Sequence, residues 1–384
     1  MSEDPASRAA ALLVDEAWDA YREGRYPRAL DAARRGVEAA ELTGDLVALV
    51  RALRAEGSVL QIQGDHAAAL VRFTRILALA EDRATAAKLD DNRAAWAVAD
   101  AYASWVDSAR VLTTIPVRDL FGVLDAGEQF LTVTGHRDWR ADLVLARAFV
   151  HRSLDELDTA IGLAREALAL KLAHRETPSW MLGSYQFNLG DMLCEAGRST
   201  EAQPYYQAIL DDPDSGRWDQ RIAHTGLASC ALAAGDNETA LVQARTATEL
   251  AEPLGDNALC TSLHVLTRAC RARGDLDAAW QSATRNLAAA NRIGSQFRRY
   301  YATRMAVDVA LDRADLEEAR PLLTELDRLA AAMDTATGLR RCADEATARH
   351  LRFGQVTRSQ SMARFGNAAL TLGAELVRRW LRWD

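Results

Sequence analysis

Hydrophobic and polar positions along the chain follow the period of amphipathic helices, and short turns interrupt that pattern at a nearly constant interval. In each unit an apolar helical stretch precedes the turn and a second one follows it, which predicts a helix–turn–helix hairpin. The turns recur about every 40 residues, with one longer interval that holds two units, and such a period indicates a repeat architecture. The predicted turn positions are Gly24, Gly64, Asp155, Gly197, Gly235, Gly274 and Ala314.

Small residues recur at fixed distances from these turns. Five positions after each turn the residue is alanine: Ala29, Ala69, Ala160, Ala202, Ala240, Ala279 and Ala319. That alanine helped to choose the register of the two units without glycine, so the position seven before the turn is the better check. It is Ala or Gly in most units: Ala17, Gly57, Ala148, Gly190, Ala228, Thr267 and Val307. We expect the paired helices to cross most closely at both sites, where a larger side chain would force them apart.

One unit resembles a tetratricopeptide repeat. It contains Asn188-Leu189-Gly190-Asp191, Ala196-Gly197-Arg198, Glu201-Ala202 and Tyr205-Tyr206, and it closes near Pro213. This is similar to the Asn-Leu-Gly, Gly, Ala, Tyr and Pro pattern of that family, with the proline one residue early. The resemblance covers about residues 8–335 and implies helices longer than those of the usual 34-residue repeat. Long repeats of this bacterial type are similar to those of peptide-sensing regulators and of the sensor portions of large transcriptional activators. A DNA-binding segment ahead of the first repeat and a nucleotide-binding portion, which those proteins carry, are not recognisable here.

The expected fold is therefore all-α: a right-handed α-solenoid of about eight such hairpins over residues 1–338, with C-terminal capping helices. The third unit, within residues 86–134, is irregular. A long helix is predicted over residues 86–110, followed by the turn Thr113-Thr114-Ile115-Pro116, with Pro116 early in the next helix. We interpret this unit as a tolerated insertion rather than a functional site.

Residues 339–384 differ from the repeats in charge. They contain nine arginines and four acidic residues, and helices are predicted over residues 339–353 and 360–382. Because a solenoid needs a terminal helix with a polar outer face, a cap is the simplest interpretation. Two alternatives stay open, since Trp380 and Trp383 lie beside arginines at the end. One is a basic amphipathic segment, 360–384, that contacts a partner or a membrane surface, and the other is a remnant leading to another domain.

Composition narrows the function classes. The 384 residues are 49% hydrophobic and 26% charged, with a net charge of −8 and only 8 prolines. An alanine-rich, proline-poor chain favours helix, and an acidic chain lacks the positive field that drives direct nucleic-acid binding. No apolar run is long enough to span a membrane, and the acidic start is unlike a secretory signal. The 5 cysteines form no CxxC pair, so we expect reduced thiols and a cytoplasmic location.

No catalytic, cofactor or metal motif stands out. The 7 histidines include no pair at the i, i+4 spacing of a helical zinc site. Phosphate-binding glycine loops and the GxSxG nucleophile motif are absent from the sequence. We therefore expect a protein without cofactor or metal that is not an enzyme. A catalytic cavity assembled from distant repeats is kept as the alternative.

The first helix of each hairpin lines the concave side of a solenoid, so its outward positions are the candidate ligand contacts. Helical spacing from the turns selects Arg51, Arg54, Phe149, Arg152, Phe187, Asp191, Glu195, His264, Arg268, Arg271, Tyr301, Arg304 and Asp308. Asn188 matches the asparagine that family members use to clamp a peptide carboxylate. Acidic residues stand where that clamp would have basic partners, which argues against clamp-type chaperone binding.

Basic candidates gather in the seventh and eighth units. His264, Arg268 and Arg271 are spaced i, i+4, i+7, so they share one helix face, and Arg304 is expected on the same side one repeat later. Arginine forks bind carboxylates with two parallel hydrogen bonds. The first hypothesis is thus a scaffold that binds a protein or peptide partner, acidic or with a free carboxylate. The second is a signalling or transcription-related regulator whose repeats sense a peptide or small ligand, and whose segment 339–384 passes the change on.

Overall fold

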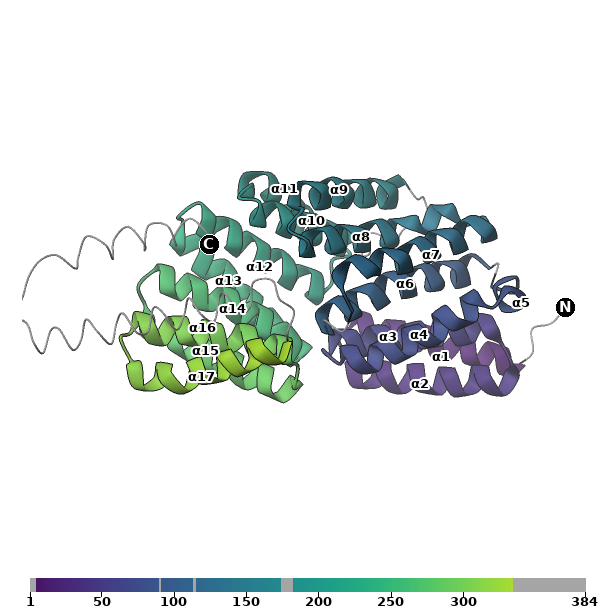
Figure 1. The fold of residues 1–384 in the computed structure, drawn as a ribbon, viewed down its shortest axis with the longest axis horizontal. Coiled ribbons are helices and arrows are strands. Elements are labelled where there is room, and N and C mark those ends of the chain that lie inside the picture. The colour runs from purple at the N-terminus through teal and green to yellow at the C-terminus, as the bar shows by residue number, and fades with distance from the viewer. Residues whose placement is uncertain (1–4, 90, 113–114, 174–181, 334–384) are drawn as a thin grey trace, which may run out of the picture.

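The structure is a computed structural model that describes residues 5–89, 91–112, 115–173 and 182–333 (Figure 1). Within these ranges the chain is helical, without strands, and its helices pair into eight consecutive hairpins. This confirms the expected all-α, tetratricopeptide-like architecture. The hairpins are α1 (Pro5–Arg22) with α2 (Tyr26–Thr43), α3 (Leu46–Ile62) with α4 (His66–Glu81), α6 (Asn92–Leu112) with α7 (Leu120–Thr134), α8 (Ala141–Ser153) with α9 (Leu157–Ala173), α10 (Leu182–Glu195) with α11 (Ser199–Asp211), α12 (Arg217–Ala233) with α13 (Asn237–Ala251), α14 (Asp256–Ala272) with α15 (Leu276–Ile293), and α16 (Gln296–Asp312) with α17 (Leu316–Met333). Short helical segments are α5 (Arg83–Ala86), η1 (Val117–Asp119), η2 (Arg137–Arg140) and η4 (Glu252–Leu254).

The turns within the hairpins lie where the sequence predicts them. All seven turn residues have positive φ, including the two without glycine, Asp155 (φ 64°) and Ala314 (φ 56°). Glycine is favoured at such positions because it adopts the left-handed region without steric cost. Aspartate then begins the next helix in several units; the Asp65 carboxylate, for example, accepts a hydrogen bond from the Ala68 amide at 3.0 Å. The Gly-Asp dipeptide therefore supplies both the turn and the helix cap.

The small-residue positions are the closest helix crossings. The alanine five positions after each turn is completely buried in all seven units. At the position before the turn, a Cβ added to Gly57 would lie 2.5 Å from the Phe73 ring, and one added to Gly190 would lie 2.7 Å from the Tyr206 ring. Tyr206 also fills the space beside Gly226, where a Cβ would approach it to 2.2 Å. Aromatic rings that pack onto glycine backbone thus join the two helices of a hairpin, and Tyr206 also joins its hairpin to the next one through Gly226.

The irregular third unit differs from its prediction at both ends. Helix α6 begins at Asn92 rather than near residue 86, because Asp91 caps it by accepting hydrogen bonds from the amides of Arg93 and Ala94 at 2.9 and 3.1 Å. Pro116 does not lie inside the next helix but directly before η1, with φ −53° and ψ 131°. Residues 113–114 of the predicted turn lie outside the described ranges.

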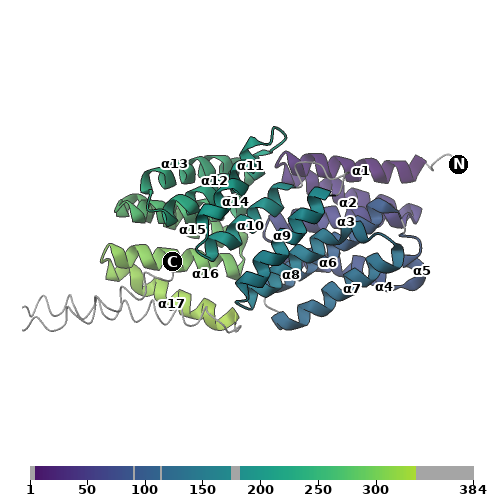
Figure 2. The ribbon, with the colours of Figure 1, turned by 90° about the horizontal axis from the view of Figure 1, so that it is seen from above.

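The stack curves until its first two hairpins contact the η4–α14 region near the start of the seventh hairpin. Figure 1 shows α1–α8 on one side and α12–α17 on the other, joined along one edge by α9–α11, and the view from above agrees (Figure 2). The Asn257 side chain of α14 donates a hydrogen bond to the Ile62 carbonyl at 2.6 Å, across 195 residues of sequence. A buried cluster that includes Ala20, Tyr26 and Leu254 lies at the same place. We call this contact between the first two hairpins and the η4–α14 region the junction.

Several sequence predictions concern residues outside the described ranges. These are the basic segment 339–384 with Cys342 and His350, the boundary after residue 338, and His174, and they stay predictions. The four described cysteines are free thiols. In the described part of the chain, no helix combines the length and the apolar character needed to cross a membrane.

Candidate functional site

The first helices of the hairpins share one interior face. In order, α1 contacts α3, α3 contacts α6 and α6 contacts α8, and beyond the middle of the chain α10, α12, α14 and α16 contact each other in the same way. Charged groups interact across this interior. Burial raises the pKa of Tyr21 on α1, and the charges of Tyr26, Arg54, Asp100 and Asp219 act on the same hydroxyl. Residues from α1, α3, α6 and α12 therefore face a common space, as the solenoid prediction requires.

The candidate arginines of the second unit are neutralised within the protein. The Arg54 guanidinium lies between the rings of Trp18 and Trp96, 4.3 and 3.9 Å from their centroids, and pairs with Asp100 at 2.7 Å. Only 8% of Arg54 is exposed. Arg51 pairs with Asp15 at 3.1 Å. The geometry gives both side chains a structural partner, and a ligand would have to displace it.

The candidates of the fourth and fifth units neutralise one another. Arg152 of α8 pairs with Asp191 at 2.8 Å and with Glu195 at 2.5 Å, both on α10. The remaining candidates there pack or bond locally: Phe149 and Phe187 lie against the buried core, and the Asn188 side chain donates to the Ser184 carbonyl at 2.7 Å. The charged candidates of these two units therefore form ion pairs with one another rather than presenting an unpaired charge.

The seventh and eighth units bring together the basic side chains that the sequence predicts to converge. Burial, followed by the charges of Arg268, Arg304, Arg298 and Arg271, lowers the pKa of His264 to about 4. A histidine surrounded by guanidinium groups resists protonation because a further positive charge would be repelled. We call these five residues, His264, Arg268, Arg271, Arg298 and Arg304, the basic cluster. It lies on α14 and α16.

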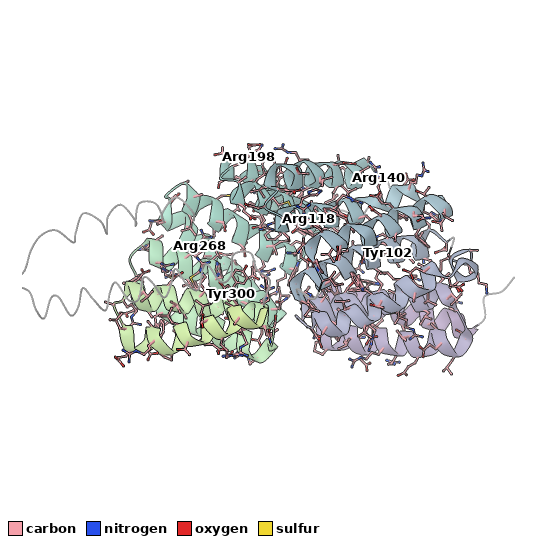
Figure 3. All side chains as sticks on the ribbon, viewed as in Figure 1. Tyr102, Arg118, Arg140, Arg198, Arg268 and Tyr300 are labelled. Carbon is pink, nitrogen blue, oxygen red and sulfur yellow. The ribbon has the colours of Figure 1, made fainter. Side chains whose placement is uncertain are left out.

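The members of the basic cluster differ in their partners. Arg271 pairs with Asp312 at 2.7 Å and approaches Asp308 at 3.9 Å. Arg268 has neither an ion pair nor a hydrogen bond with any residue that the structure describes, and it is half-buried. Figure 3 shows Arg268 in the half of the molecule built from α12–α17, on the opposite side from Tyr102. A ligand could therefore bind the guanidinium of Arg268 without first displacing an ion-pair partner.

Tyr301 is the exposed aromatic candidate of the eighth unit. Its side chain is 39% exposed, and its ring lies 4.8 Å from that of Phe297 and 5.3 Å from that of Tyr300. Such a ring group offers an apolar surface on the same helix as Arg304. Tyr301 therefore fits the expectation of an aromatic anchor beside the basic side chain of Arg304.

Sequence reasoning missed two basic residues of the interior, Arg221 on α12 and Arg298 on α16. The nitrogen atoms Nε and Nη1 of Arg221 are buried without a hydrogen-bond partner in the described structure, and the residue is 2% exposed. Arg298 donates one long hydrogen bond, 3.4 Å, to the Thr261 hydroxyl. Arg298 lies one helical turn before Tyr301, the first candidate selected on its helix, so extending that spacing would have reached it. Arg221 was missed because no candidate was selected in the sixth unit.

The opposite wall of the interior is polar and partly acidic. Asp107 on α6 pairs with Arg110 at 2.7 Å and accepts a hydrogen bond from Gln61 at 3.3 Å, and its charge also acts on Arg298. Burial lowers the pKa of His66 on α4, and Arg298 contributes to that shift. Arg298 of the basic cluster therefore interacts electrostatically with the N-terminal hairpins. Among the described residues, no three His, Cys, Asp or Glu side chains are arranged to hold a metal ion.

Comparison with known proteins identifies the fold. No protein-family model and no curated protein matches the sequence. Solved structures do match over nearly the whole chain. A Rap protein complexed with competence and sporulation factor has a TM-score of 0.53 at 13% identity, over 92% of this chain and 99% of that one. NprR in complex with its cognate peptide NprX has a TM-score of 0.53 at 14% identity, over 92% and 98%.

A third similar structure bears the name of an enzyme. Aspartyl phosphate phosphatase F from Bacillus subtilis has a TM-score of 0.52 at 14% identity, over 93% of this chain and 95% of that one. Identities this low establish a shared fold and leave the activity of this chain as a separate question. The protein has the tetratricopeptide-like α-solenoid fold that these structures share.

Proposed function

We propose that the protein binds a peptide, or a peptide segment of a partner protein, in its interior groove. The observation that carries the proposal is Arg268, a half-buried guanidinium with no described partner inside a group of four arginines. The chain as a whole carries a net charge of −8, whereas this group of arginines is locally positive. Such an arrangement favours an acidic peptide or one with a free carboxylate, because complementary potentials select the partner and its orientation.

The fold supports a peptide rather than a small rigid ligand. Two of the similar structures contain a peptide or factor bound to the same kind of solenoid, namely the Rap complex and the NprR complex. A preformed groove with separated aromatic and arginine anchors suits an extended chain that is contacted at several points. The expectation that the protein is not an enzyme stays a prediction, since one similar structure is named a phosphatase.

The test is a charge reversal at Arg268. Pools of short random peptides, one with free carboxyl termini and one amidated, would be passed over the immobilised protein and the retained peptides identified by mass spectrometry. We expect retention of acidic or free-acid peptides by the wild type and a loss of about tenfold or more in affinity for Arg268→Glu. Arg245→Glu, an exposed arginine on α13, is the matched control and should retain binding. Equal retention by both variants would contradict the proposal.

Reversal of Arg271 would be a poor test. Its guanidinium bonds Asp312 and lies near Asp308, so a glutamate there would gather three acidic side chains and damage the fold. Loss of binding in such a variant would report instability. The single change at Arg268 avoids this because no described ion pair is broken.

A second candidate function is that of a regulator, and the junction favours it. The Asn257–Ile62 hydrogen bond joins hairpins two and seven directly, so a ligand in the enclosed groove would contact both sides of the closure. Small-angle scattering with and without a retained peptide would measure the radius of gyration. A regulator of this kind predicts a change in that radius on binding, whereas a rigid scaffold predicts none.

A further inference from the structure

Arg221 is a buried positive charge without a counter-ion. It is 2% exposed, its Nε and Nη1 atoms have no hydrogen-bond partner in the described structure, and its guanidinium lies 4.2 Å from the centroid of the Trp218 ring. The aromatic face holds the guanidinium plane but accepts none of its N–H bonds. Burying a charge in this way is unfavourable unless something pairs with it. The environment of Arg221 is therefore incomplete.

The neighbouring acidic groups do not complete it. Asp219 is the nearest in sequence, but its carboxylate accepts a hydrogen bond from the Gly216 amide at 3.3 Å, and no ion pair joins it to Arg221 in the described structure. Burial raises the pKa of Tyr26 to about 12, so its hydroxyl is neutral at neutral pH. Burial raises the pKa of Asp219 to about 6, so this carboxylate is only weakly protonated at neutral pH, and it acts on Arg221 through space rather than by direct contact. Burial lowers the pKa of Arg221 to about 10, which still leaves it charged at neutral pH.

A second guanidinium lies within electrostatic range. Arg298, from α16, lowers the pKa of Arg221 further, as one positive charge disfavours another. Its guanidinium donates one long hydrogen bond, to the Thr261 hydroxyl, and Asp107 on α6 already forms an ion pair with Arg110. Two like charges from separate helices thus interact across the interior, and neither forms an ion pair with a residue that the structure describes. Strongly perturbed ionisable groups of this kind cluster at functional sites.

We propose that Arg221 and Arg298 form a binding site for an oxyanion, a carboxylate or phosphate group, beside the junction. Planar guanidinium forks match the geometry of these groups, and Trp218 fixes the orientation of one fork. Trp218 also packs with the buried cluster of Ala20, Tyr26 and Leu254 that closes the junction. An anion bound here contacts the C-terminal half where the N-terminal hairpins rest on it. The site shares Arg298 with the basic cluster but does not include Arg268, and it can be occupied whether or not a peptide binds at Arg268.

The first experiment measures thermal unfolding in sodium phosphate or succinate against sodium chloride of the same ionic strength. Bound anion stabilises the folded protein by mass action, so we expect the wild-type melting temperature to rise by about 2 °C or more. Arg221→Met should melt higher than the wild type in chloride, because an unpaired buried charge is removed, and should lose the response to phosphate. Arg245→Met on the exposed face of α13 is the matched control and should behave as the wild type.

The second experiment keeps the proposal testable if Arg221→Met does not fold. Phosphate is titrated into the wild type and into Trp218→Phe, and the difference in tryptophan fluorescence isolates the indole that stacks on Arg221. We expect a saturable change in that difference, and its loss in Arg298→Gln. A fluorescence difference that does not respond, or a wild type that gains nothing over chloride, would overturn the site.

Two arms identify the source of the oxyanion. The pools of free-acid and amidated short peptides replace phosphate in both measurements. A response to free-acid peptides alone assigns the site to a peptide carboxylate, whereas a response to phosphate but to neither pool assigns it to a small free anion. In the latter case the oxyanion site stands even if the Arg268 experiment fails, so the two failures are distinguishable.

Discussion

The interior of the solenoid has two regions whose arginines differ in whether they form ion pairs. On α3 and α8, Arg54 and Arg152 are paired with Asp100, Asp191 and Glu195 at 2.5–2.8 Å. On α12, α14 and α16, Arg221 and Arg268 have no ion pair in the described structure, and Arg298 has a single long hydrogen bond. The first region stabilises the stack, and the second pays an electrostatic cost that a bound anion would offset. Position on the concave face therefore does not by itself indicate a binding role.

The largest expected effect comes from breaking the paired region at Arg54. Arg54→Ala leaves the Asp100 carboxylate, which is 17% exposed, without its partner and removes the cation that Trp18 and Trp96 enclose. Loss of one member of a buried pair costs about 3 kcal/mol. Arg268→Ala should change stability by less than about 0.5 kcal/mol. Urea unfolding followed by circular dichroism compares the two, and equal losses would contradict the distinction between the regions.

Acid should weaken the basic region through His264. The pKa of His264 is lowered to about 4 by burial and by neighbouring arginines, while that of an unfolded histidine is about 6.5. Between these values the unfolded chain binds more protons than the folded one, so stability falls as the pH falls from about 6.5 to about 4. We expect this contribution to be on the order of 1 kcal/mol, measured as melting temperature against pH.

The control for that measurement is His264→Gln, which removes the titrating group and should flatten the curve over the same window. Asp219 acts in the opposite direction, because a carboxyl with its pKa raised to about 6 makes the folded protein bind more protons below that pH. The difference between wild type and His264→Gln cancels this common contribution. A difference that does not vary with pH would show that His264 is not held neutral.

The ion pairs of Arg152 in the paired region can also be removed by mutating its two acidic partners. Asp191→Asn with Glu195→Gln removes both partners of Arg152 while keeping the side-chain shapes. Because these carboxylates are 41% and 45% exposed, we expect a stability loss below about 1 kcal/mol. Affinity for acidic peptides should rise about threefold, as measured by fluorescence anisotropy. Unchanged affinity would place the peptide path away from α8 and α10.

The smallest effect is expected at Arg51. Its partner Asp15 is 60% exposed, and pairs with such solvent access contribute about 0.5 kcal/mol or less. Arg51→Ala should therefore leave the urea midpoint nearly unchanged and should not alter peptide affinity. A loss comparable to that of Arg54→Ala would show that Arg51 belongs to the buried ion-pair network.

The repeat pattern predicted the backbone better than it predicted the site. Asp155 and Ala314 were placed at turns solely by register, and both have positive φ. The convergence of His264, Arg268, Arg271 and Arg304 was also predicted, because helical spacing and repeat length determine which side chains share a face. The start of α6 was missed because Asp91 caps the helix, and Arg221 was missed because no candidate was selected in the sixth unit, which contains α12.

The sequence by itself determined the hairpins, their turns and their closest crossings, because these depend on local properties: the φ range of glycine, the cap formed by aspartate, and the size of alanine. Tertiary structure alone decided which arginines are neutralised and where the stack closes. Arg54 finds Asp100 at a separation of 46 residues and Asn257 finds Ile62 at 195. Such pairings follow from the accumulated curvature of the whole array, since small rotations at each hairpin add up before distant side chains meet.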